Sequence, residues 1–318
     1  MTASKQLPVL LWALIIGIGI PFSLPAQSAR AEEKPIHILC STFPIYQITR
    51  NVTKGRSAAQ VELMIPAQLG CPHDYALTPQ DMRALAQADL MVINGLGLEE
   101  FIGPSIKQAN PRITIIDSSI GVTETIDYAD GPGPGEDDHA VHEHQGINPH
   151  LFVSPRLVAQ ITMNIADGLA RFDPEGSEVY RKNGEAYARE MTRLGQEVAA
   201  LGPHLKNRRI LTQHGVFDYL ARDLGLRVVA VVQAHAGQQP SAAEMLAIIK
   251  TAKENKAGAI FSEPQYPVQV VETIAQEAGI KSATLNPVAT GPENAPLDYY
   301  AKTMRTNLAT LQSTLGTE

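Results

Sequence analysis

Several features that would indicate other classes of protein are absent from this sequence. Basic residues number 26 against 33 acidic residues, and the net charge of −7 argues against nucleic acid or an anionic membrane surface as a partner. No segment after the N-terminal region is long and apolar enough to span a bilayer. The histidines also lack the local spacing of a zinc finger or an H-E-x-x-H helix, so spacing alone does not define a metal site.

The first 31 residues have the organisation of an export signal. Lys5 provides a positive start, residues 9–20 are apolar, and residues 29–31 read Ala-Arg-Ala before Glu32. No cysteine stands at this cleavage point, so we expect a cleavable signal peptide over residues 1–31 and no lipid anchor. The mature protein is therefore expected to be periplasmic, and we expect it to be a monomer.

The two cysteines, Cys40 and Cys71, suit an oxidising compartment. Each follows or ends a predicted strand, so a disulfide between them is expected if the two strands are parallel neighbours. The alternative is that Cys71, two residues before His73, binds a metal as a thiolate. The compartment favours the disulfide, and both interpretations remain open at this point.

Strand-like and helix-like patterns alternate after the signal, which predicts parallel sheets with crossover helices. We therefore expect an α/β fold of two β/α lobes. The expected strands are residues 36–40, 61–65, 90–93, 113–116, 209–212, 227–232, 259–262 and 282–285. The expected helices are residues 45–52, 79–87, 98–109, 156–172, 177–201, 216–224, 241–255, 268–278 and 297–315, with a break at Gly103-Pro104 in the third.

The longest helical pattern lies between the two halves and predicts a connecting helix. We place the N-terminal lobe at residues 32–176, the connecting helix at 177–205 and the C-terminal lobe at 206–318. Residues 131–145 are rich in Gly, Pro, acidic residues and His, with no hydrophobic period, so we read them as a surface loop.

Histidines occur where predicted strands or loops end in both lobes. His73 lies in a proline-flanked turn just before a helix that Thr78 caps and Pro79 begins. His150 precedes the next helix, and His214 directly follows a strand of the second lobe. Open α/β sheets place ligands at the carboxyl ends of their strands, so these imidazoles are candidates for one metal site between the lobes.

Short motifs occur along nearly the whole mature chain, at Thr42-Phe43-Pro44, Pro72-His73-Asp74-Tyr75, Ala88-Asp89-Leu90, Asn94 to Glu99, Asn148-Pro149-His150, Ser154-Pro155, His214 to Leu220, Glu263-Pro264-Gln265 and Leu285-Asn286-Pro287. Together these motifs resemble those of the zinc/manganese-binding solute-binding proteins of ABC transporters, the cluster A-I or high-affinity zinc uptake family. They occur in the family's order. The resemblance implies a two-lobed carrier with a metal site in the cleft between the lobes.

The resemblance also implies the metal ligands. The family's three histidines fall on His73, His150 and His214, and its fourth position, usually an aspartate, falls on Asn286. An amide is a poorer zinc ligand than a carboxylate, so water, Glu263, Cys71 or a loop histidine are alternatives at that position. Asp74 and Tyr75 are expected to orient the His73 turn by hydrogen bonds.

Three imidazoles favour Zn²⁺ over manganese, which prefers oxygen ligands. The resemblance therefore implies a non-enzymatic protein that captures Zn²⁺ as transported ligand and delivers it to an ABC permease in the inner membrane. A second group, comprising His139, His142 and His144 of the 131–145 loop, is either a weak metal-recruiting site or merely solvated.

Two alternatives remain. One is a manganese or iron carrier, or an adhesin, with the same fold. The other is a secreted zinc hydrolase, because three protein ligands with an open position also describe catalytic zinc, and Glu263 would then be its general base.

Overall fold

The computed structural model describes residues 1–2, 34–70, 75–127, 146–233 and 239–316. The chain divides into Met1–Glu33 and a compact unit, Lys34–Glu318, and the fold below is that of the compact unit. Several predictions lie outside the described residues. They concern the signal peptide, Cys71, His73, Asp74, and the loop histidines His139, His142 and His144.

The described residues form two four-stranded parallel sheets, which confirms the predicted α/β fold with two β/α lobes. The first has the order β2-β1-β3-β4 and the second the order β6-β5-β7-β8, so the two sheets have the same topology. The strands are β1 Ile36–Cys40, β2 Ala59–Leu63, β3 Leu90–Ile93, β4 Thr114–Asp117, β5 Arg209–Thr212, β6 Arg227–Val231, β7 Ala259–Ser262 and β8 Lys281–Thr284.

The helices agree with the predicted ones to within a few residues. They are α1 Phe43–Thr53, α2 Pro79–Gln87, α3 Gly103–Ala109, α4 Pro155–Phe172, α5 Ser177–Leu201, α6 Asp218–Leu224, α7 Ala242–Glu254, α8 Gln269–Ala278 and α9 Tyr299–Leu315. The break expected at Gly103-Pro104 is present, because a separate 3₁₀ turn, η1 Glu100–Ile102, precedes α3. Two more short 3₁₀ turns matter below, η3 Leu151–Val153 and η6 Gly215–Phe217.

The predicted start of α2 is confirmed in detail. The Thr78 side chain accepts a hydrogen bond from the Asp81 backbone N–H at 3.2 Å, and Asp81 Oδ2 accepts from the Thr78 N–H at 2.7 Å. This reciprocal capping satisfies two backbone donors that the first helical turn leaves unpaired. Tyr75 also donates its hydroxyl to Asp81, at 2.9 Å, so it is tied to the start of α2.

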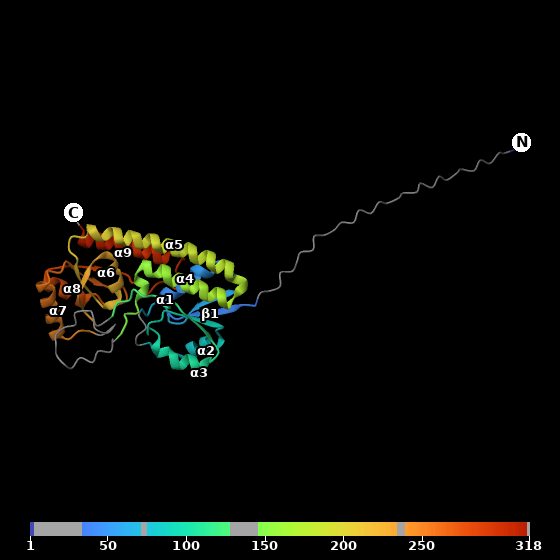
Figure 1. Ribbon diagram of the computed structural model, residues 1–318, viewed down its shortest axis with the longest axis horizontal. Helices are drawn as coiled ribbons and strands as arrows, with labels where there is room; N and C mark the ends of the chain where they lie inside the picture. Colours follow the sequence, from blue (N-terminus) through green and yellow to red (C-terminus); the bar gives the residue numbers. More distant parts are fainter. Residues whose placement is uncertain (3–33, 71–74, 128–145, 234–238, 317–318) are drawn as a thin grey trace. The chain divides into compact units, whose positions relative to one another are not determined.

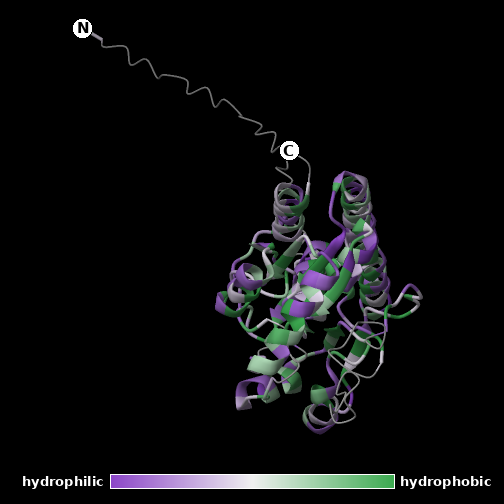
Figure 2. Ribbon diagram, turned by 90° about the vertical axis from the view of Figure 1, so that its left-hand side faces the viewer, coloured by the Kyte–Doolittle hydropathy of each residue, from purple (hydrophilic) through white to green (hydrophobic). Residues whose placement is uncertain are grey.

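One continuous hydrophobic core runs through both lobes. It contains the inner strands of each sheet together with residues of α1, α4, α5 and α9. The 25-residue helix α5 packs along α4 and also contacts α1, α6 and α9, so the predicted connecting helix joins elements of both halves. Figure 1 shows α5 and α9 running side by side, and Figure 2 shows the apolar strands enclosed by helices.

Direct hydrogen bonds also cross between the halves. Tyr300 of α9 donates its hydroxyl to the Phe152 carbonyl at 2.7 Å. Tyr219 of α6 donates to the Asn148 carbonyl at 2.7 Å and accepts from the Ile126 N–H at 3.1 Å. The segment that carries His150 is therefore fixed to the second lobe by buried hydroxyl groups, which lose little freedom when they bond.

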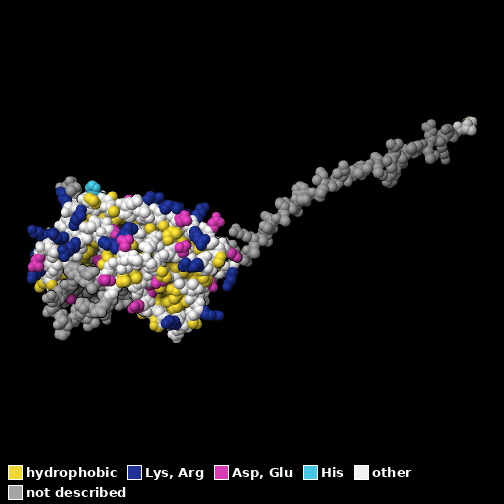
Figure 3. Space-filling model, in the orientation of Figure 1, with side chains coloured by type: hydrophobic (Ala, Val, Ile, Leu, Met, Phe, Trp, Pro, Cys, Tyr) yellow, Lys and Arg dark blue, Asp and Glu magenta, His cyan; other side chains and the backbone are white. Residues whose placement is uncertain are grey.

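Among the described residues, no helix combines the length and apolar character that crossing a bilayer requires. On the face drawn in Figure 3, Lys and Arg side chains are intermixed with Asp and Glu rather than gathered into a patch of one sign. A surface with both signs interspersed is ordinary for a folded protein.

Cys40 is fully buried, and burial raises the pKa of its thiol to about 12. Strands β1 and β2 are parallel neighbours, as the disulfide prediction required, and their register pairs Cys40 with Leu63. Cys71 lies outside the described residues, and no disulfide is formed within them. The Cys40–Cys71 bond therefore stays a prediction.

Candidate metal centre

Two of the three predicted histidine ligands come together where the lobes meet. His150 is fully buried just before η3, and His214 is 5% exposed directly before η6 and two residues beyond β5. Their ring centres lie 5.3 Å apart, with the ring planes at 84°. Because 64 positions separate them in the sequence, only the fold brings these imidazoles together.

The separation of the rings can be compared with that in a zinc site. Two imidazoles that bind one tetrahedral zinc ion through nitrogens about 2.0–2.1 Å from the metal hold their ring centres about 5.2 Å apart. The observed 5.3 Å matches this spacing. The spacing of the two rings is therefore compatible with one tetrahedral metal.

Glu263 determines the orientation of His214. Its Oε1 lies 2.5 Å from His214 Nδ1, and its Oε2 accepts a hydrogen bond from Gln265 Nε2 at 2.7 Å. A carboxylate oxygen is an acceptor, so Nδ1 of His214 carries the proton and Nε2 carries the lone pair. Such a carboxylate–histidine pair fixes the ring and makes the other nitrogen a stronger metal ligand.

Asn148 performs the corresponding function for His150. Its Oδ1 accepts a hydrogen bond from the His150 backbone N–H at 3.0 Å and lies 2.8 Å from His150 Nδ1. Its Nδ2 donates to the Gly215 carbonyl at 2.8 Å and to Asp218 Oδ2 at 3.0 Å. The oxygen of this amide thus faces His150, and its nitrogen faces the turn that follows His214.

Asn286, the predicted fourth position, is a partly buried residue engaged in local bonds. Its Oδ1 accepts from the Val288 N–H at 2.8 Å, and its Nδ2 lies 3.4 Å from the Tyr299 hydroxyl. The backbone of Asn286 pairs with the Asn307 amide in both directions, at 2.9 and 2.7 Å. A lone pair of Oδ1 is therefore already used to close a turn, which makes this amide a weaker candidate than the imidazoles.

Two carboxyl groups, one beside the Asn148 amide and one at the end of the first sheet, have raised pKa values. Burial raises the pKa of Asp218 to about 6, although the hydrogen bond from Asn148 acts in the opposite direction. Burial also raises the pKa of Glu99 to about 7, against the lowering effect of hydrogen bonds from the Ser41 hydroxyl and from the Asn94 and Gly95 backbone. Raised carboxyl pKa values are what removal of water from a charged group produces.

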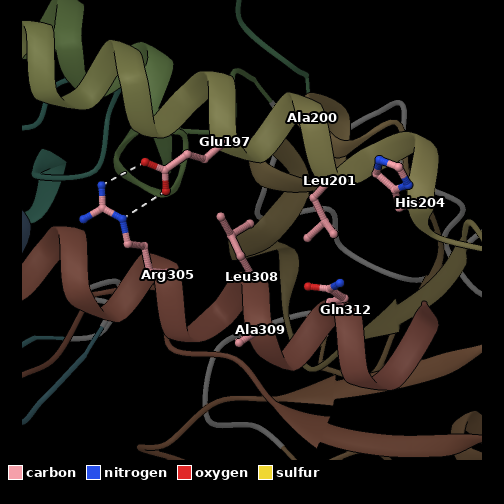
Figure 4. Close-up of a pocket in the computed structure, with 8 residues that line it drawn as sticks. All are labelled: Glu197, Ala200, Leu201, His204, Arg305, Leu308, Ala309 and Gln312. Carbon is pink, nitrogen blue, oxygen red and sulfur yellow. Dashed lines mark hydrogen bonds and ion pairs between the residues drawn. The ribbon is translucent and has the colours of Figure 1, made fainter. Parts of the chain in front are cut away.

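The described residues by themselves do not contain a group of three or more His, Cys, Asp or Glu side chains placed to hold a metal. His37, in β1, is partly buried, and His204 is exposed, as expected for residues outside the site. His204 borders a hollow of about 520 Å³ between α5 and α9, which none of the predicted ligands lines. Figure 4 shows this hollow, closed at one end by the Glu197–Arg305 ion pair.

Several residues of the centre had no predicted role. Asn148 and Gln265 stand in the matched motifs, but only the structure reveals what their amides contact. One local signal was available for Asn148, because an asparagine side chain commonly accepts a hydrogen bond from the backbone two residues on, here His150. No local signal indicated that Glu263 would bond to His214, 49 positions away.

Comparison with known proteins agrees with the fold and the motifs. The chain is 29% identical over 297 residues to the high-affinity zinc uptake system protein ZnuA of Bacillus subtilis (strain 168), covering 91% of this chain and 90% of that protein. It is 27% identical over 310 residues to the zinc-binding lipoprotein AdcA of Streptococcus pneumoniae, covering 96% of this chain but only 61% of AdcA. The chain thus spans less than two thirds of that relative.

Solved structures give the same result. A crystal structure of ZnuA superposes with a TM-score of 0.73 at 28% identity, covering 89% of this chain and 100% of that chain. The solute-binding protein FpvC of Pseudomonas aeruginosa, in complex with Mn²⁺, superposes with a TM-score of 0.74 at 28% identity, covering 89% and 98%. The sequence pattern of the family described as "Zinc-uptake complex component A periplasmic" (ZnuA) matches residues 38–314, and the chain belongs to this family.

Proposed function

We propose that this protein captures Zn²⁺ outside the inner membrane and delivers it to an ABC permease for import. The observation that carries the proposal is the buried contact of His150 with His214, in which each Nδ1 is held by an oxygen acceptor. This arrangement leaves Nε2 of both rings as the nitrogen with a lone pair, which is the form of imidazole that binds zinc.

The proposed ligands are His73, His150 and His214. The last two are the pair described above, and His73 is assigned by its place in the family motif, since it lies outside the described residues. Glu263 has both oxygens occupied, by His214 and Gln265, so we assign it to supporting the ring rather than to the metal. The fourth position goes to Asn286 Oδ1, to water, or to a donor among Cys71 and the loop histidines, and zinc-edge X-ray absorption would count these donors.

Family membership places the protein in the periplasmic or extracellular space. We further propose that residues 1–31 are a cleavable signal peptide without a lipid anchor, since no cysteine stands at the cleavage point. N-terminal sequencing of the exported protein should start at Glu32. A start at any position within residues 1–20 would contradict cleavage.

Zinc titration in competition with a chelator of known affinity tests the proposed function. The intact protein should bind one zinc ion tightly, and His150→Ala or His214→Ala should weaken binding by more than the roughly 100-fold that loss of a supporting hydrogen bond causes. His204→Ala is the matched control, because this exposed histidine lies outside the site, and it should change nothing. Equal binding by all four proteins would overturn the proposal.

Acid should release the metal. Imidazole must be neutral to bind zinc, and imidazoles in model peptides titrate near about pH 6.5, so each histidine ligand costs about tenfold in affinity per pH unit below that value. Zinc affinity should therefore fall steeply between about pH 6.5 and pH 5. A flat affinity across this interval would contradict a site of three imidazoles.

The same titration with Mn²⁺ addresses the alternative cargo. A related solute-binding protein has been seen with Mn²⁺, but two or three imidazoles with the carboxylate engaged elsewhere favour zinc. Zn²⁺ should displace Mn²⁺ at equal concentrations. The hydrolase alternative needs a carboxylate able to activate water, and the only one nominated, Glu263, is bonded to His214 and Gln265 through both oxygens.

A further inference from the structure

The amide of Asn148 touches both histidine-bearing segments. Its oxygen faces His150, and its nitrogen faces Gly215 and Asp218, which lie one and four residues beyond His214. The residue is fully buried, so none of these contacts is exchanged for water. This one amide therefore contacts the His150 ring and the turn after His214 at the same time.

The contacts determine which way the amide is turned. The His150 backbone N–H is a donor only and must face the amide oxygen, at 3.0 Å. The Gly215 carbonyl is an acceptor only and must face the amide nitrogen, at 2.8 Å. A reversed amide would oppose donor to donor and acceptor to acceptor, leaving buried polar groups unsatisfied at a cost that excludes it.

The amide orientation determines the tautomer of His150. Because the atom at 2.8 Å from His150 Nδ1 is an oxygen with no proton to give, Nδ1 must be the protonated ring nitrogen. The lone pair is then on Nε2. An imidazole in solution populates both tautomers, so this contact removes a form of His150 that would present a proton to a metal.

The nitrogen of the same amide bonds to residues of the second lobe. Gly215 begins the 3₁₀ turn η6, and His214 is the residue immediately before it. A bond to the Gly215 carbonyl therefore restrains the backbone at the start of this turn, and a second bond holds the side chain of Asp218, the residue that follows the turn. Tyr219 adds a bond from the same helix to the Asn148 carbonyl, at 2.7 Å.

We propose that Asn148 is a positioning residue that selects the metal-binding tautomer of His150 and, through the same amide, fixes the turn that carries His214. The expected effect on zinc affinity rests on the proposed function. The tautomer of His150 and the rigidity of the turn can be measured without zinc. The amide thus prepares one ligand of each lobe before the metal arrives, which lowers the reorganisation that binding requires.

Two variants of Asn148 distinguish the role of the amide oxygen from the role of the amide nitrogen. Asn148→Ala removes acceptor and donors together, whereas Asn148→Asp keeps an acceptor for His150 Nδ1 and loses both donors to the second lobe. Asn183→Ala is the control for the same truncation, since the Asn183 amide also bonds two backbone carbonyls, those of Val52 and Lys54, at 3.0 and 2.7 Å, but contacts neither histidine.

The tautomer is read from long-range ¹H–¹⁵N correlation spectra of zinc-free protein, with the His150 signal identified by its loss in His150→Ala. The unaltered protein, Asn183→Ala and Asn148→Asp should show His150 protonated at Nδ1. Asn148→Ala should show a mixture of tautomers. Hydrogen exchange of the η6 amides should be faster in both Asn148 variants than in the other two proteins.

Zinc affinity should fall by about 10–100-fold in Asn148→Ala, as for other groups that orient a histidine ligand, and stay unchanged in Asn183→Ala. An unaltered tautomer and unaltered exchange in Asn148→Ala would overturn the inference, as would zinc binding within about twofold of the parent. Should Asn148→Ala not fold, Asn148→Asp decides. Retained Nδ1 protonation with faster η6 exchange supports the inference, and slow exchange overturns it.

The outcomes also separate this inference from the proposed function. If the unaltered protein binds no zinc tightly, the proposed function fails, while the tautomer and exchange data still determine what Asn148 does. If it binds zinc tightly and the Asn148 variants behave as the control, only the positioning role fails.

Discussion

The two lobes share one strand order but carry different chemistry at the same place. The Ser41 N–H bonds to a β3 carbonyl at 3.0 Å, and the Gln213 N–H bonds to a β7 carbonyl at 2.9 Å. The residues next in the chain, Thr42 and His214, are therefore equivalent. In the first lobe this position begins helix α1, and in the second it presents an imidazole to His150.

A buried glutamate follows the equivalent strand in each lobe. Glu99, after β3, accepts hydrogen bonds from the Ser41 hydroxyl at 2.7 Å and from backbone N–H groups of its own loop. Glu263, after β7, accepts instead from His214 Nδ1 and Gln265. A buried carboxyl group that follows the equivalent strand, β3 or β7, therefore has different roles in the two lobes. Glu99 holds a loop in the first lobe, and Glu263 supports a proposed metal ligand in the second.

Glu263→Gln should have the largest effect of the changes that test the difference between the roles of Glu263 and Glu99. The amide keeps the shape of the side chain but loses the charge, and its NH₂ would face the donors on His214 or Gln265. Zinc affinity should fall by about 10–100-fold, measured by chelator competition at neutral pH. Glu99→Gln is the equivalent change in the first lobe, and it should have a much smaller effect because Glu99 contacts neither histidine. Equal losses of zinc affinity in the two variants would contradict the different roles assigned to Glu263 and Glu99.

Glu99 should instead affect how stability depends on pH. Its pKa rises from 4.5 to about 7 on folding, so the native protein binds more protons than the unfolded chain between these values. This contribution to stability is fully present below about pH 4.5 and is lost as pH rises through about 7, a change of about 2–3 kcal/mol between pH 5 and pH 8. Urea unfolding at both pH values should show this slope in the parent. Glu99→Gln should be flatter by that amount.

Ser41→Ala should make the unfolding free energy depend more strongly on pH. The serine hydroxyl donates to Glu99 at 2.7 Å and lowers the carboxyl pKa, so its removal raises that pKa further and leaves the ionised form less well bonded. We expect a loss of about 1.5 kcal/mol of unfolding free energy at pH 8, and a smaller loss at pH 5 where Glu99 is protonated. Unfolding curves at the two pH values measure this. A loss that is the same at both would show that the bond does not depend on the charge.

Gln265→Ala should give the smallest effect. It removes the donor to Glu263 Oε2 but leaves the bond between Glu263 and His214 in place. A single hydrogen bond of this kind contributes about 1 kcal/mol, so zinc affinity should fall by about fivefold. Gln160→Ala, which removes a surface bond to the Gly121 carbonyl, is the control for the same truncation. A loss as large as that of Glu263→Gln would mean that Gln265, too, determines the ring orientation.

Much of the architecture followed from local pattern. The Thr78-Pro79 start of α2, the break at Gly103 and the bounds of β1 and β3 were predicted because capping, proline geometry and apolar runs act over a few residues. Element ends such as those of β2 and β8 differed by one or two residues, since pairing with neighbouring strands, rather than composition, determines where a strand stops.

The candidate site was only partly predictable. His150 and His214 were selected because they follow strand or loop ends and stand in family motifs, and the structure brings them into contact. The partners that give them their tautomers could not be derived, because Asn148 and Glu263 act through contacts whose geometry depends on the whole fold. A sequence shows which groups can bind a metal, but it does not show which nitrogen of an imidazole holds the proton.

The hydrophobic core that runs through both lobes has a thermal consequence. Its largest cluster includes apolar side chains of both halves, so neither half can lose this part of its packing without exposing side chains of the other, whereas two smaller clusters each lie within one half. Heating should therefore produce a single endotherm whose calorimetric and van't Hoff enthalpies agree, instead of one transition for each half. Added zinc should move that endotherm upward as a whole, by mass action, so a melting curve would report the occupancy of a site that comprises only a few side chains.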